Sequence, residues 1–440
     1  MAHRVASHEI FLRSAGPFPI VPRRRPSVVL CLKVSPSLPR VWIRGLAVLL
    51  AVGLTLTARA QTPERIVAIG DIHGASTVFR ALLQVADLTD DSGAWTGGTT
   101  TLVQTGDFTD RGAGVRQVME LLMRLEREAP AAGGEVRVLL GNHEMMNLMA
   151  DVRDATPDIY GAFATDDSPA RRGAAYLTYG GWAAQRETEL GYPLPDLRTR
   201  EEWLAAHPPG FVEYMEAFGP EGEYGEWLRQ RPIATRVGDT LFLHGGLSPD
   251  GAAASADALN EQARSELAQF DEYREHLINR GLILPFSTFS ELLSATALEL
   301  NVWATRLAPD PADPGRRVRV SNEDRRLIDV LLGVQGLGEW SVIDPDGPLW
   351  YRGFARWSDT EGEAQLPAVL QRFDVARVVV GHSVTPDRRV AARFAGRVFL
   401  IDTGMLIPTY QGRGSALELV GPEVTAVYLD GREMLAAPTP

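Results

Sequence analysis

Side chains that could bind metal ions are concentrated in five short motifs of this 440-residue chain. Four of its eight histidines lie in these motifs, together with several aspartates and an asparagine. Carboxylate oxygen, imidazole nitrogen and amide oxygen are ligands that suit a divalent cation, so the pattern predicts a metal centre. The motifs are GDIHG (Gly70–Gly74), GDFTDRG (Gly106–Gly112), GNHE (Gly141–Glu144), HGG (His244–Gly246) and GHS (Gly381–Ser383).

The spacing of these ligands is suited to two metal ions. Asp71 and His73 alternate across a strand end, so both can face one ion while Ile72 points away. Asp107, at the tip of the next expected strand, can bridge two ions through its carboxylate. Two such cations can hold a bridging hydroxide at neutral pH and stabilise an in-line displacement at phosphorus. The six candidate metal ligands are Asp71, His73, Asp107, Asn142, His244 and His382.

Other residues of the motifs could handle the charge and the proton of such a reaction. Arg111 carries a planar guanidinium that matches phosphate oxygens. His143 is placed to protonate a leaving alkoxide or phenoxide, and Asp110 could orient it and favour its charged form. One such motif alone would indicate little, but five in order predict hydrolysis of phosphate esters by a metal-bound hydroxide.

Each motif follows a short apolar run, which predicts a buried strand. The helical periodicity after the first two motifs adds a β-α-β-α-β order, which predicts an α/β layer structure. In open α/β sheets, ligands bind beyond the C-terminal ends of the strands, where these motifs lie. The runs are Ile66–Ile69, Leu102–Val103, Val138–Leu140, Leu241–Leu243 and Val378–Val380, and later strands are expected at Arg397–Ile401, Ala416–Leu419 and Val424–Leu429.

Two long segments, approximately 145–230 and 255–340, interrupt this pattern. We interpret them as helical insertions that form a cap around the site, although they could be peripheral scaffold. Their histidines, His207 and His276, are expected to be surface or helix-end residues. Helices are expected at Ala174–Leu190, Glu201–Phe218, Asp257–Leu277 and Phe289–Leu307.

Residues 1–60 have the features of an N-terminal extension with a signal peptide. Arg40 and Arg44 precede the apolar run Leu46–Leu56, and an A-x-A cleavage signature ends at Ala60. The alternative is an uncleaved anchor, but the run is short for a membrane span. We therefore expect a periplasmic or secreted catalytic domain, residues 61–440, with no stable membrane insertion after cleavage.

Removal of this segment makes the chain more acidic. Residues 1–60 carry nine basic residues and one acidic residue, so the net charge of −12 becomes −20 for residues 61–440. An acidic surface repels nucleic acid, which counts against a nuclease. The expected substrate is a phosphorylated protein, a peptide or a small phosphate ester, with no nucleic-acid partner. The only cysteine, Cys31, lies in the removed segment, so no disulfide is expected.

The combined motifs resemble those of the calcineurin-like metallophosphoesterases, and the first three are similar to the phosphoprotein phosphatase branch. PLWYRG (Pro348–Gly353) and IDTGM (Ile401–Met405) resemble elements of the bacterial Shewanella-like phosphatases. The resemblance extends over residues 65–430 and implies a four-layer α/β/β/α sandwich. It also implies that Asp107 bridges the two metals and that His143 is a general acid paired with Asp110. Asp71 and His73 would complete the first metal site, and Asn142, His244 and His382 the second.

The resemblance implies a second phosphate-binding arginine besides Arg111. Arg352 is our candidate, with Arg229 or Arg231 as alternatives, and a structural role for Arg352 is equally open. The neighbouring aromatic residues Trp350, Tyr351 and Trp357 are expected to be core or pocket wall.

Three functions compete on this evidence. We favour a phosphomonoester hydrolase similar to protein serine/threonine/tyrosine phosphatases, with two divalent or mixed-valence Mn, Fe or Zn ions. The second is a dinucleoside polyphosphate hydrolase or phosphodiesterase, because IDTGM is also similar to bacterial diadenosine tetraphosphatases. Many phosphodiesterases of the superfamily carry GHxH, with a second histidine on the first metal. Val384 stands at that position here, which favours a phosphomonoesterase or a diadenosine hydrolase over a phosphodiesterase. The third is a non-catalytic binding protein, which the complete ligand set disfavours.

Overall fold

The computed structural model describes residues 64–195, 197–251, 253–309 and 318–435. These residues belong to one compact unit, Thr62–Pro440. The expected signal peptide and its cleavage site lie outside the described residues. Among the described helices, none combines the length and the apolar character needed to cross a membrane.

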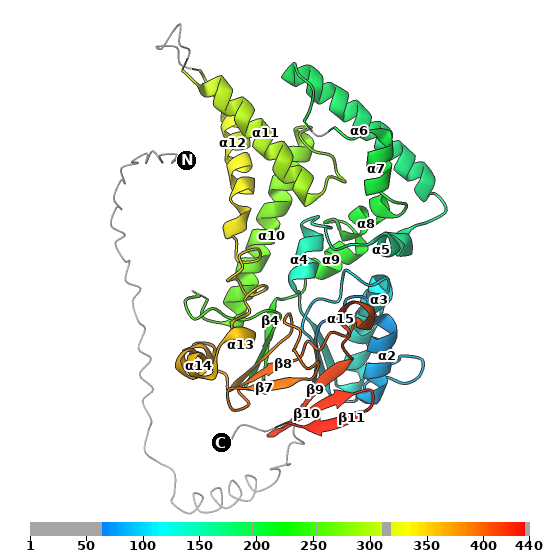
Figure 1. Ribbon diagram of the computed structural model, residues 1–440, viewed down its shortest axis with the longest axis vertical. Coiled ribbons are helices and arrows are strands. Elements are labelled where there is room, and N and C mark those ends of the chain that lie inside the picture. The colour runs from blue at the N-terminus through cyan, green and yellow to red at the C-terminus, as the bar shows by residue number, and fades with distance from the viewer. Residues whose placement is uncertain (1–63, 196, 252, 310–317, 436–440) are drawn as a thin grey trace, which may run out of the picture. The chain divides into compact units, whose positions relative to one another are not determined.

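Two mixed β-sheets form the centre of the unit (Figure 1). The first has the strand order β11-β10-β9-β1-β2-β3 and the second β4-β5-β6-β8-β7. Strands β1, β2 and β3 are parallel, as are β5, β6 and β8, so the loops that follow the strands of each set leave at one edge. The strands are β1 (Arg65–Ile69), β2 (Thr101–Gln104), β3 (Glu135–Val138), β4 (Ala234–Val237), β5 (Thr240–Leu243), β6 (Arg377–Val380), β7 (Ala391–Arg393), β8 (Val398–Leu400), β9 (Ser415–Val420), β10 (Glu423–Tyr428) and β11 (Gly431–Met434).

Alternate residues of the central strands face two different cores. Ile66 and Ala68 of β1 pack in one cluster with Phe242, Val379 and Phe399 of the second sheet. The residues between them along each strand join a second, larger cluster that includes the helices. This period of two is what a strand buried on both faces requires. The predicted α/β/β/α sandwich is therefore confirmed.

Helices cover the outer faces of both sheets. Helices α2 (Ser76–Val85) and α3 (Val115–Glu128) lie against the first sheet. The buried face of α3 carries Val115, Val118, Leu122 and Leu125, as its helical periodicity predicted. Helices α13 (Gly353–Arg356) and α14 (Asp359–Phe373) lie on the opposite side of the sandwich (Figure 1).

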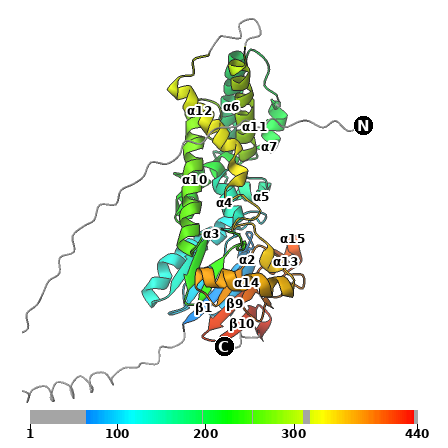
Figure 2. The same ribbon diagram turned by 90° about the vertical axis from the view of Figure 1, so that its left-hand side faces the viewer.

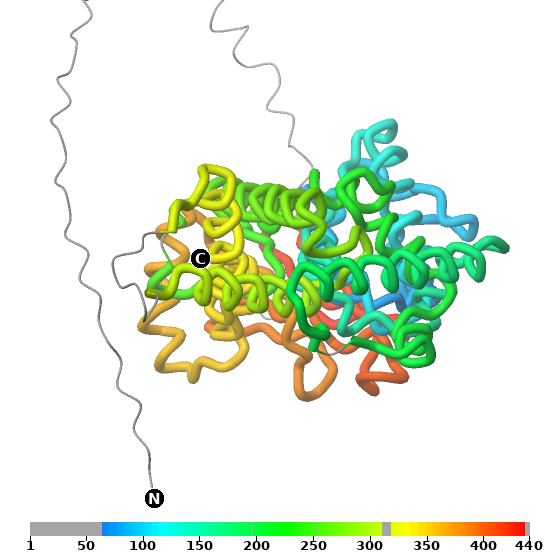
Figure 3. Tube along the Cα trace, turned by 90° about the horizontal axis from the view of Figure 1, so that it is seen from above, coloured from blue at the N-terminus to red at the C-terminus, as the bar shows by residue number. Residues whose placement is uncertain are grey.

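Both insertions are helical, and Figures 1 and 2 place α6, α11 and α12 beyond the same edge of the sheets. Seen from above, these helices lie over the sandwich (Figure 3). The predicted helices at Ala174–Leu190, Asp257–Leu277 and Phe289–Leu307 are all present. The segment predicted as Glu201–Phe218 is two helices, because Pro208 and Gly210 interrupt it. The insertion helices are α4 (Asn142–Leu148), α5 (Pro157–Phe163), α6 (Ser168–Leu190), α7 (Arg200–Ala206), α8 (Phe211–Phe218), α9 (Glu223–Arg229), α10 (Ala256–Asn279), α11 (Phe289–Leu307) and α12 (Asn322–Gln335).

Candidate active site

The loops that follow β1, β2 and β6 adopt a strained backbone where the motif residues lie. Five of these residues have positive φ angles, which only glycine adopts at little cost. Such strain is concentrated at functional sites, where surrounding contacts hold it in place. The residues are His73 (φ 45°), Asp107 (57°), Asp110 (64°), Arg111 (67°) and His382 (65°).

Glu144 holds the strained loop after β2. Its Oε2 accepts hydrogen bonds from the backbone N–H groups of Asp107 (2.7 Å) and Gly141 (2.8 Å). Its Oε1 accepts from the N–H groups of Phe108 and Thr109, both at 2.9 Å. The carboxylate is fully buried, so it compensates backbone donors that water cannot reach. No role for Glu144 was predicted, although it is the last residue of GNHE.

Asp107 occupies the centre of the candidate metal site. Its Oδ2 lies 3.2 Å from Nε2 of His244, 3.7 Å from Nε2 of His73 and 3.8 Å from Nε2 of His143. Its Oδ1 accepts a hydrogen bond from the backbone N–H of His143 at 3.0 Å. Burial opposes ionisation, but His244, His143 and His73 hold the pKa of Asp107 well below its usual range. One carboxylate oxygen thus faces imidazoles on both sides, as a bridging ligand requires.

Backbone carbonyls fix the orientation of three histidines. The pairs are His73 Nδ1 with Thr109 O (2.9 Å), His244 Nδ1 with Thr105 O (3.0 Å) and His382 Nε2 with Trp350 O (3.1 Å). When the carbonyl-bound nitrogen carries the proton, the other nitrogen presents its lone pair to the site, an arrangement common to metal-binding histidines. Burial lowers the pKa of His73 to about 3 and that of His382 to about 2, so both imidazoles are neutral.

These donors form two clusters that share Asp107. Within each cluster, the potential ligand atoms all lie within 4.8 Å of one another, and the members are His73, Asp107 and His143 in one and Asp107, His244 and His382 in the other. Nε2 of His244 also lies 2.9 Å from Oδ1 of Asn142 and 3.1 Å from Nδ1 of His382. Buried lone pairs that face each other are compensated by a cation. With His143 set aside as the predicted proton donor, the remaining carboxylate, imidazole and amide donors fit two divalent ions.

Asp71 lies beside these clusters rather than within them. Its Oδ1 accepts a hydrogen bond from the backbone N–H of His382 at 2.9 Å. Burial and the nearby carboxylates of Asp402 and Asp107 raise the pKa of Asp71 well above its usual range. Burial also raises the pKa of Asp402 to about 6. Asp402, in the IDTGM element, was not predicted as a site residue, and this crowding of buried carboxylates is further reason to place cations here.

His143 and Asp110 form the buried pair that the sequence predicted. Nδ1 of His143 lies 2.7 Å from Oδ2 of Asp110. Burial alone would lower the pKa of His143, but Asp107 and Asp110 raise it to about 9. The carbonyl oxygen of His143 accepts a hydrogen bond from Asn147 (2.9 Å), which in turn accepts one from Tyr214 (2.5 Å). The two carboxylates thus favour the charged form of the imidazole, and Asp110 fixes its orientation at Nδ1.

Arg111 is positioned by residues that sequence analysis missed. One of its Nη atoms lies 2.6 Å from Nε2 of His73 and donates to the phenol oxygen of Tyr410. The other Nη atom lies 3.7 Å from the side-chain Oδ2 of Asp154. The backbones of the two residues are also joined, because the N–H of Arg111 donates to the carbonyl oxygen of Asp154 at 3.2 Å. The guanidinium lies 5.6 Å from the ring centre of Tyr410. Tyr410 and Asp154 lie outside the five motifs, so no local signal indicated them.

Of the three candidates for a second phosphate-binding arginine, the structure brings Arg352 to the site. Its Nη1 donates to the carbonyl oxygen of His382 (2.7 Å) and to Oγ of Ser383 (3.1 Å). Arg229 is instead bound by both carboxylate oxygens of Asp271, each at 2.9 Å. Arg231 is paired with Glu126. Trp350, predicted as pocket wall, lies with its ring 6.0 Å from that of His382.

Comparison with known proteins agrees with this geometry. The family model described as calcineurin-like phosphoesterase matches residues 64–386, well over half of the chain. This chain belongs to the calcineurin-like phosphoesterase family. Members of this family are metallophosphoesterases, which use divalent metals.

Relatives of this calcineurin-like phosphoesterase include Shewanella-like protein phosphatases. It is 33% identical to Shewanella-like protein phosphatase 2 of Arabidopsis thaliana over 217 aligned residues. The alignment covers 49% of this chain and 54% of that protein. The chain thus spans about half the length of that relative. It is 22% identical to Shewanella-like protein phosphatase 1 of Plasmodium berghei, over 79% of this chain and 69% of that protein. A cold-active protein-tyrosine phosphatase of a psychrophilic Shewanella species aligns with a TM-score of 0.48 and 24% identity, over 85% of this chain and 80% of that one.

The two other described histidines lie apart from this phosphoesterase site, as predicted. His276 is in the last turn of α10. His207 ends α7, but it is buried rather than on the surface, with its ring stacked 4.0 Å from that of Trp203. Its Nδ1 bonds the carbonyl oxygen of Trp203 at 2.7 Å.

Proposed function

We propose that this chain is a phosphomonoester hydrolase that acts on phosphoserine, phosphothreonine or phosphotyrosine in proteins or peptides, or on small phosphate esters. The observation that carries the proposal is the presence of two arginines at the candidate metal site. Arg111 contacts His73 and Arg352 contacts the carbonyl of His382. A monoester phosphate is a dianion with three terminal oxygens, which two guanidiniums match better than they match the single charge of a diester. The names of the relatives support the same class.

In this proposal, the six predicted ligands would hold two divalent ions, which would supply positive charge and an activated water for the reaction. Arg111 and Arg352 orient the phosphate between them. His143 has Nδ1 bound to Asp110, so its Nε2–H is free to donate a proton to the leaving oxygen. Asp110 keeps the imidazole in place during that transfer.

Two further features of the proposal concern the metals and the compartment. Mn, Fe and Zn all suit a set of carboxylates, imidazoles and an amide. The signal-peptide features of residues 1–60 support a periplasmic or secreted enzyme.

Steady-state kinetics of residues 61–440 would test the proposal. The protein would be treated with chelator, given Mn²⁺, and assayed on p-nitrophenyl phosphate beside bis-p-nitrophenyl phosphate. We expect metal-dependent turnover with a higher kcat/KM for the monoester, and loss of turnover in Asp107→Asn. Faster cleavage of the diester would instead support the phosphodiesterase or dinucleoside polyphosphate hydrolase alternative. Metal binding without any turnover would support a non-catalytic protein.

A further inference from the structure

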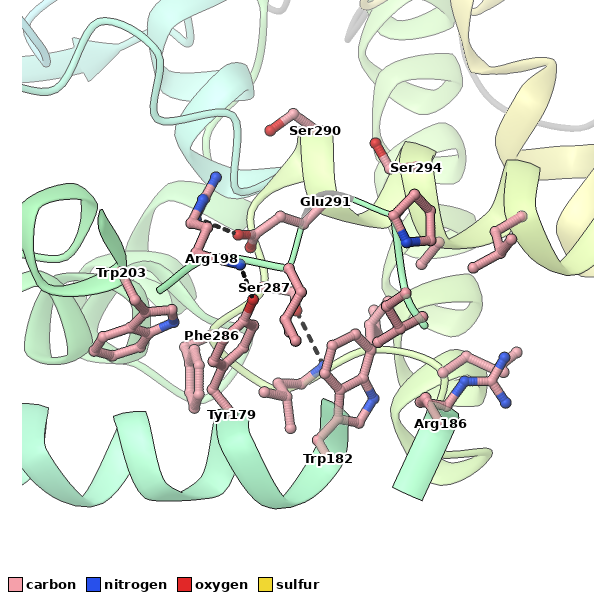
Figure 4. Close-up of a pocket in the computed structure, with 18 of the residues that line it drawn as sticks. Tyr179, Trp182, Arg186, Arg198, Trp203, Phe286, Ser287, Ser290, Glu291 and Ser294 are labelled. Atoms are coloured by element: carbon pink, nitrogen blue, oxygen red, sulfur yellow. Dashed lines mark hydrogen bonds and ion pairs between the residues drawn. The ribbon is translucent and has the colours of Figure 1, made fainter. Parts of the chain in front are cut away.

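A cavity of about 320 Å³ lies between the two insertions (Figure 4). Helices α6 and α7, with Leu194, Pro195, Leu197 and Arg198, form one wall, and residues 282–287 with the first turns of α11 form the other. Its lining includes none of the candidate metal ligands. The volume falls within the range of roughly 300–1,000 Å³ that is usual for small-molecule sites.

Flat aromatic side chains form one wall of this cavity (Figure 4). The rings of Tyr179 and Trp182 stack with centres 6.0 Å apart, and Trp203 lies 6.0 Å from Tyr179. Hydrogen bonds fix two of these rings: Nε1 of Trp182 donates to the carbonyl of Gly281 (2.9 Å), and the phenol of Tyr179 accepts from the backbone N–H of Arg198 (3.0 Å). A rigid aromatic surface is pre-organised for stacking a planar ring.

The charges around the cavity are already paired. Arg186 bonds Glu189 and Glu299, each at 2.6 Å, and Arg198 bonds Glu291 at 2.9 Å. These guanidiniums have carboxylate partners, so the cavity is not suited to a second phosphate. Ser287, Ser290 and Ser294 add hydroxyl groups along its α11 side. The chemistry therefore favours a neutral planar ligand with one hydrogen-bonding edge.

The α11 wall of the cavity is joined to the candidate active site. The backbone N–H of Phe289, the first residue of α11, donates to the carbonyl of Ala150 at 2.8 Å. Ala150 has a positive φ of 62° and begins the short segment that ends at Asp154. Asp154 accepts from the backbone of Arg111 at 3.2 Å. Helix α11 is therefore hydrogen-bonded to the same short segment whose Asp154 holds Arg111.

We propose that this cavity binds a neutral, planar aromatic molecule with a hydrogen-bonding edge, and that its occupancy changes the KM of the active site through residues 150–154. The binding site stands independently of the proposed function, and only the kinetic effect rests on it. We expect displacement of the α11 wall to alter how Asp154 holds Arg111. KM is therefore expected to respond more than kcat.

Calorimetric titration with 2-naphthol, which is neutral at pH 7, would test the binding site. We expect saturable binding by the full chain and much weaker binding of cyclohexanol, which has the hydroxyl but no flat ring. Trp182→Ala removes the stacking surface and Ala295→Trp fills the cavity, so each is expected to weaken 2-naphthol binding roughly tenfold or more. Leu177→Ala is the matched control, because Leu177 lies on the same helix, is 73% exposed and does not line the cavity.

Thermal unfolding of each variant would confirm that it folds, and kinetics on p-nitrophenyl phosphate would test the coupling. Saturating 2-naphthol is expected to change KM about twofold or more in the wild type and in Leu177→Ala, but not in Ala295→Trp. Absence of saturable binding, or wild-type affinity in the folded Trp182→Ala and Ala295→Trp variants, would overturn the binding site. An unchanged wild-type KM at saturation would overturn the coupling. The heat of binding needs no turnover, so these results are distinguishable from failure of the phosphatase proposal.

Discussion

At the scale of single residues, the candidate site is organised as much by supporting side chains as by its predicted ligands. Glu144 gathers four backbone N–H groups of the loops after β2 and β3, and so positions Asp107. Tyr410 and Asp154 position Arg111 in the same way, through a hydrogen bond and an ion pair to its guanidinium. Because phosphate esters are recognised by geometry as well as charge, removal of these supports is expected to affect catalysis without removing a reacting group.

Tyr410→Phe keeps the ring but removes the hydroxyl that accepts from Arg111. We expect KM for p-nitrophenyl phosphate to rise roughly threefold to tenfold, because one hydrogen bond to a charged partner is lost. In an Arg111→Ala background the same change is expected to have little effect, which a double-mutant cycle would measure. Tyr192→Phe, at a residue 46% exposed, serves as the control. Additive effects of the two changes would contradict a role that acts through Arg111.

His143→Asn removes the proposed proton donor. The loss of kcat is expected to be about 10²–10⁴-fold for an alkyl phosphate, whose leaving oxygen needs the proton. It should be much smaller for p-nitrophenyl phosphate, since p-nitrophenolate leaves without protonation. The measurement compares kcat of both proteins on the two substrates at fixed pH. An equal loss on both substrates would indicate that His143 has a structural or metal-binding role instead.

At the scale of elements, the loops of the site pack backbone against backbone. A Cβ atom on Gly106 would lie 2.3 Å from the backbone nitrogen of Gly141, and one on Gly141 would lie 2.2 Å from Oδ1 of Asp107. Glycines at these positions therefore let the ends of β2 and β3 approach closely enough for Asp107 to meet the other ligands. This need for close backbone approach explains why glycine recurs in the motifs GDFTDRG and GNHE.

Gly106→Ala would test this close approach. Gly106 has φ 96°, and its alanine variant would also clash with Gly141, so we expect a loss of about 3 kcal/mol or more in the free energy of unfolding. Gly98→Ala is the matched control, since Gly98 has φ 57° but nothing within 4 Å of an added Cβ. Its expected cost is only about 1 kcal/mol, from backbone strain. Urea unfolding of both variants measures the difference, and similar losses would mean that space at Gly106 is unimportant.

At the scale of the whole molecule, the candidate metal site joins the two sheets of the sandwich. Asp71, Asp107 and Asn142 follow strands of the first sheet, whereas His244 and His382 follow strands of the second. Ions bound between them would link the sheets in the folded state only. Metal binding should therefore stabilise the fold as well as supply chemistry.

Removal of metal is expected to lower the melting temperature of the protein. Mn²⁺ at about 100 times its dissociation constant contributes about 2.7 kcal/mol to the free energy of unfolding if it binds only the folded chain. Scanning calorimetry with and without chelator measures the shift. Asp107→Asn should abolish most of the Mn²⁺ effect, while Asp374→Asn, at an exposed carboxylate that caps the C-terminal end of α14, should leave it intact. Equal Mn²⁺ stabilisation of both variants would show that the ion binds elsewhere.

The sequence by itself determined the features that depend on local pattern. The strands before the motifs, the long insertion helices and the pair His143–Asp110 were predictable, because apolar periodicity and residue spacing act over short stretches of chain. Strand β7 was missed because Ala391–Arg393 is short and none of its residues is fully buried. Helix α14 contains Pro367, which obscured it, although Ser358 and Glu361 form a capping box that could have indicated its start.

Only the tertiary structure decided which distant side chains meet. It placed Arg352 against His382, while Arg229 and Arg231 bind carboxylates elsewhere. It also brought Tyr410 to Arg111, which lies 299 residues earlier in the chain. The physical reason is that such contacts depend on how the two sheets and the insertions pack, and packing joins residues whose separation along the chain carries no periodic signal. The same packing created the aromatic cavity between the insertions.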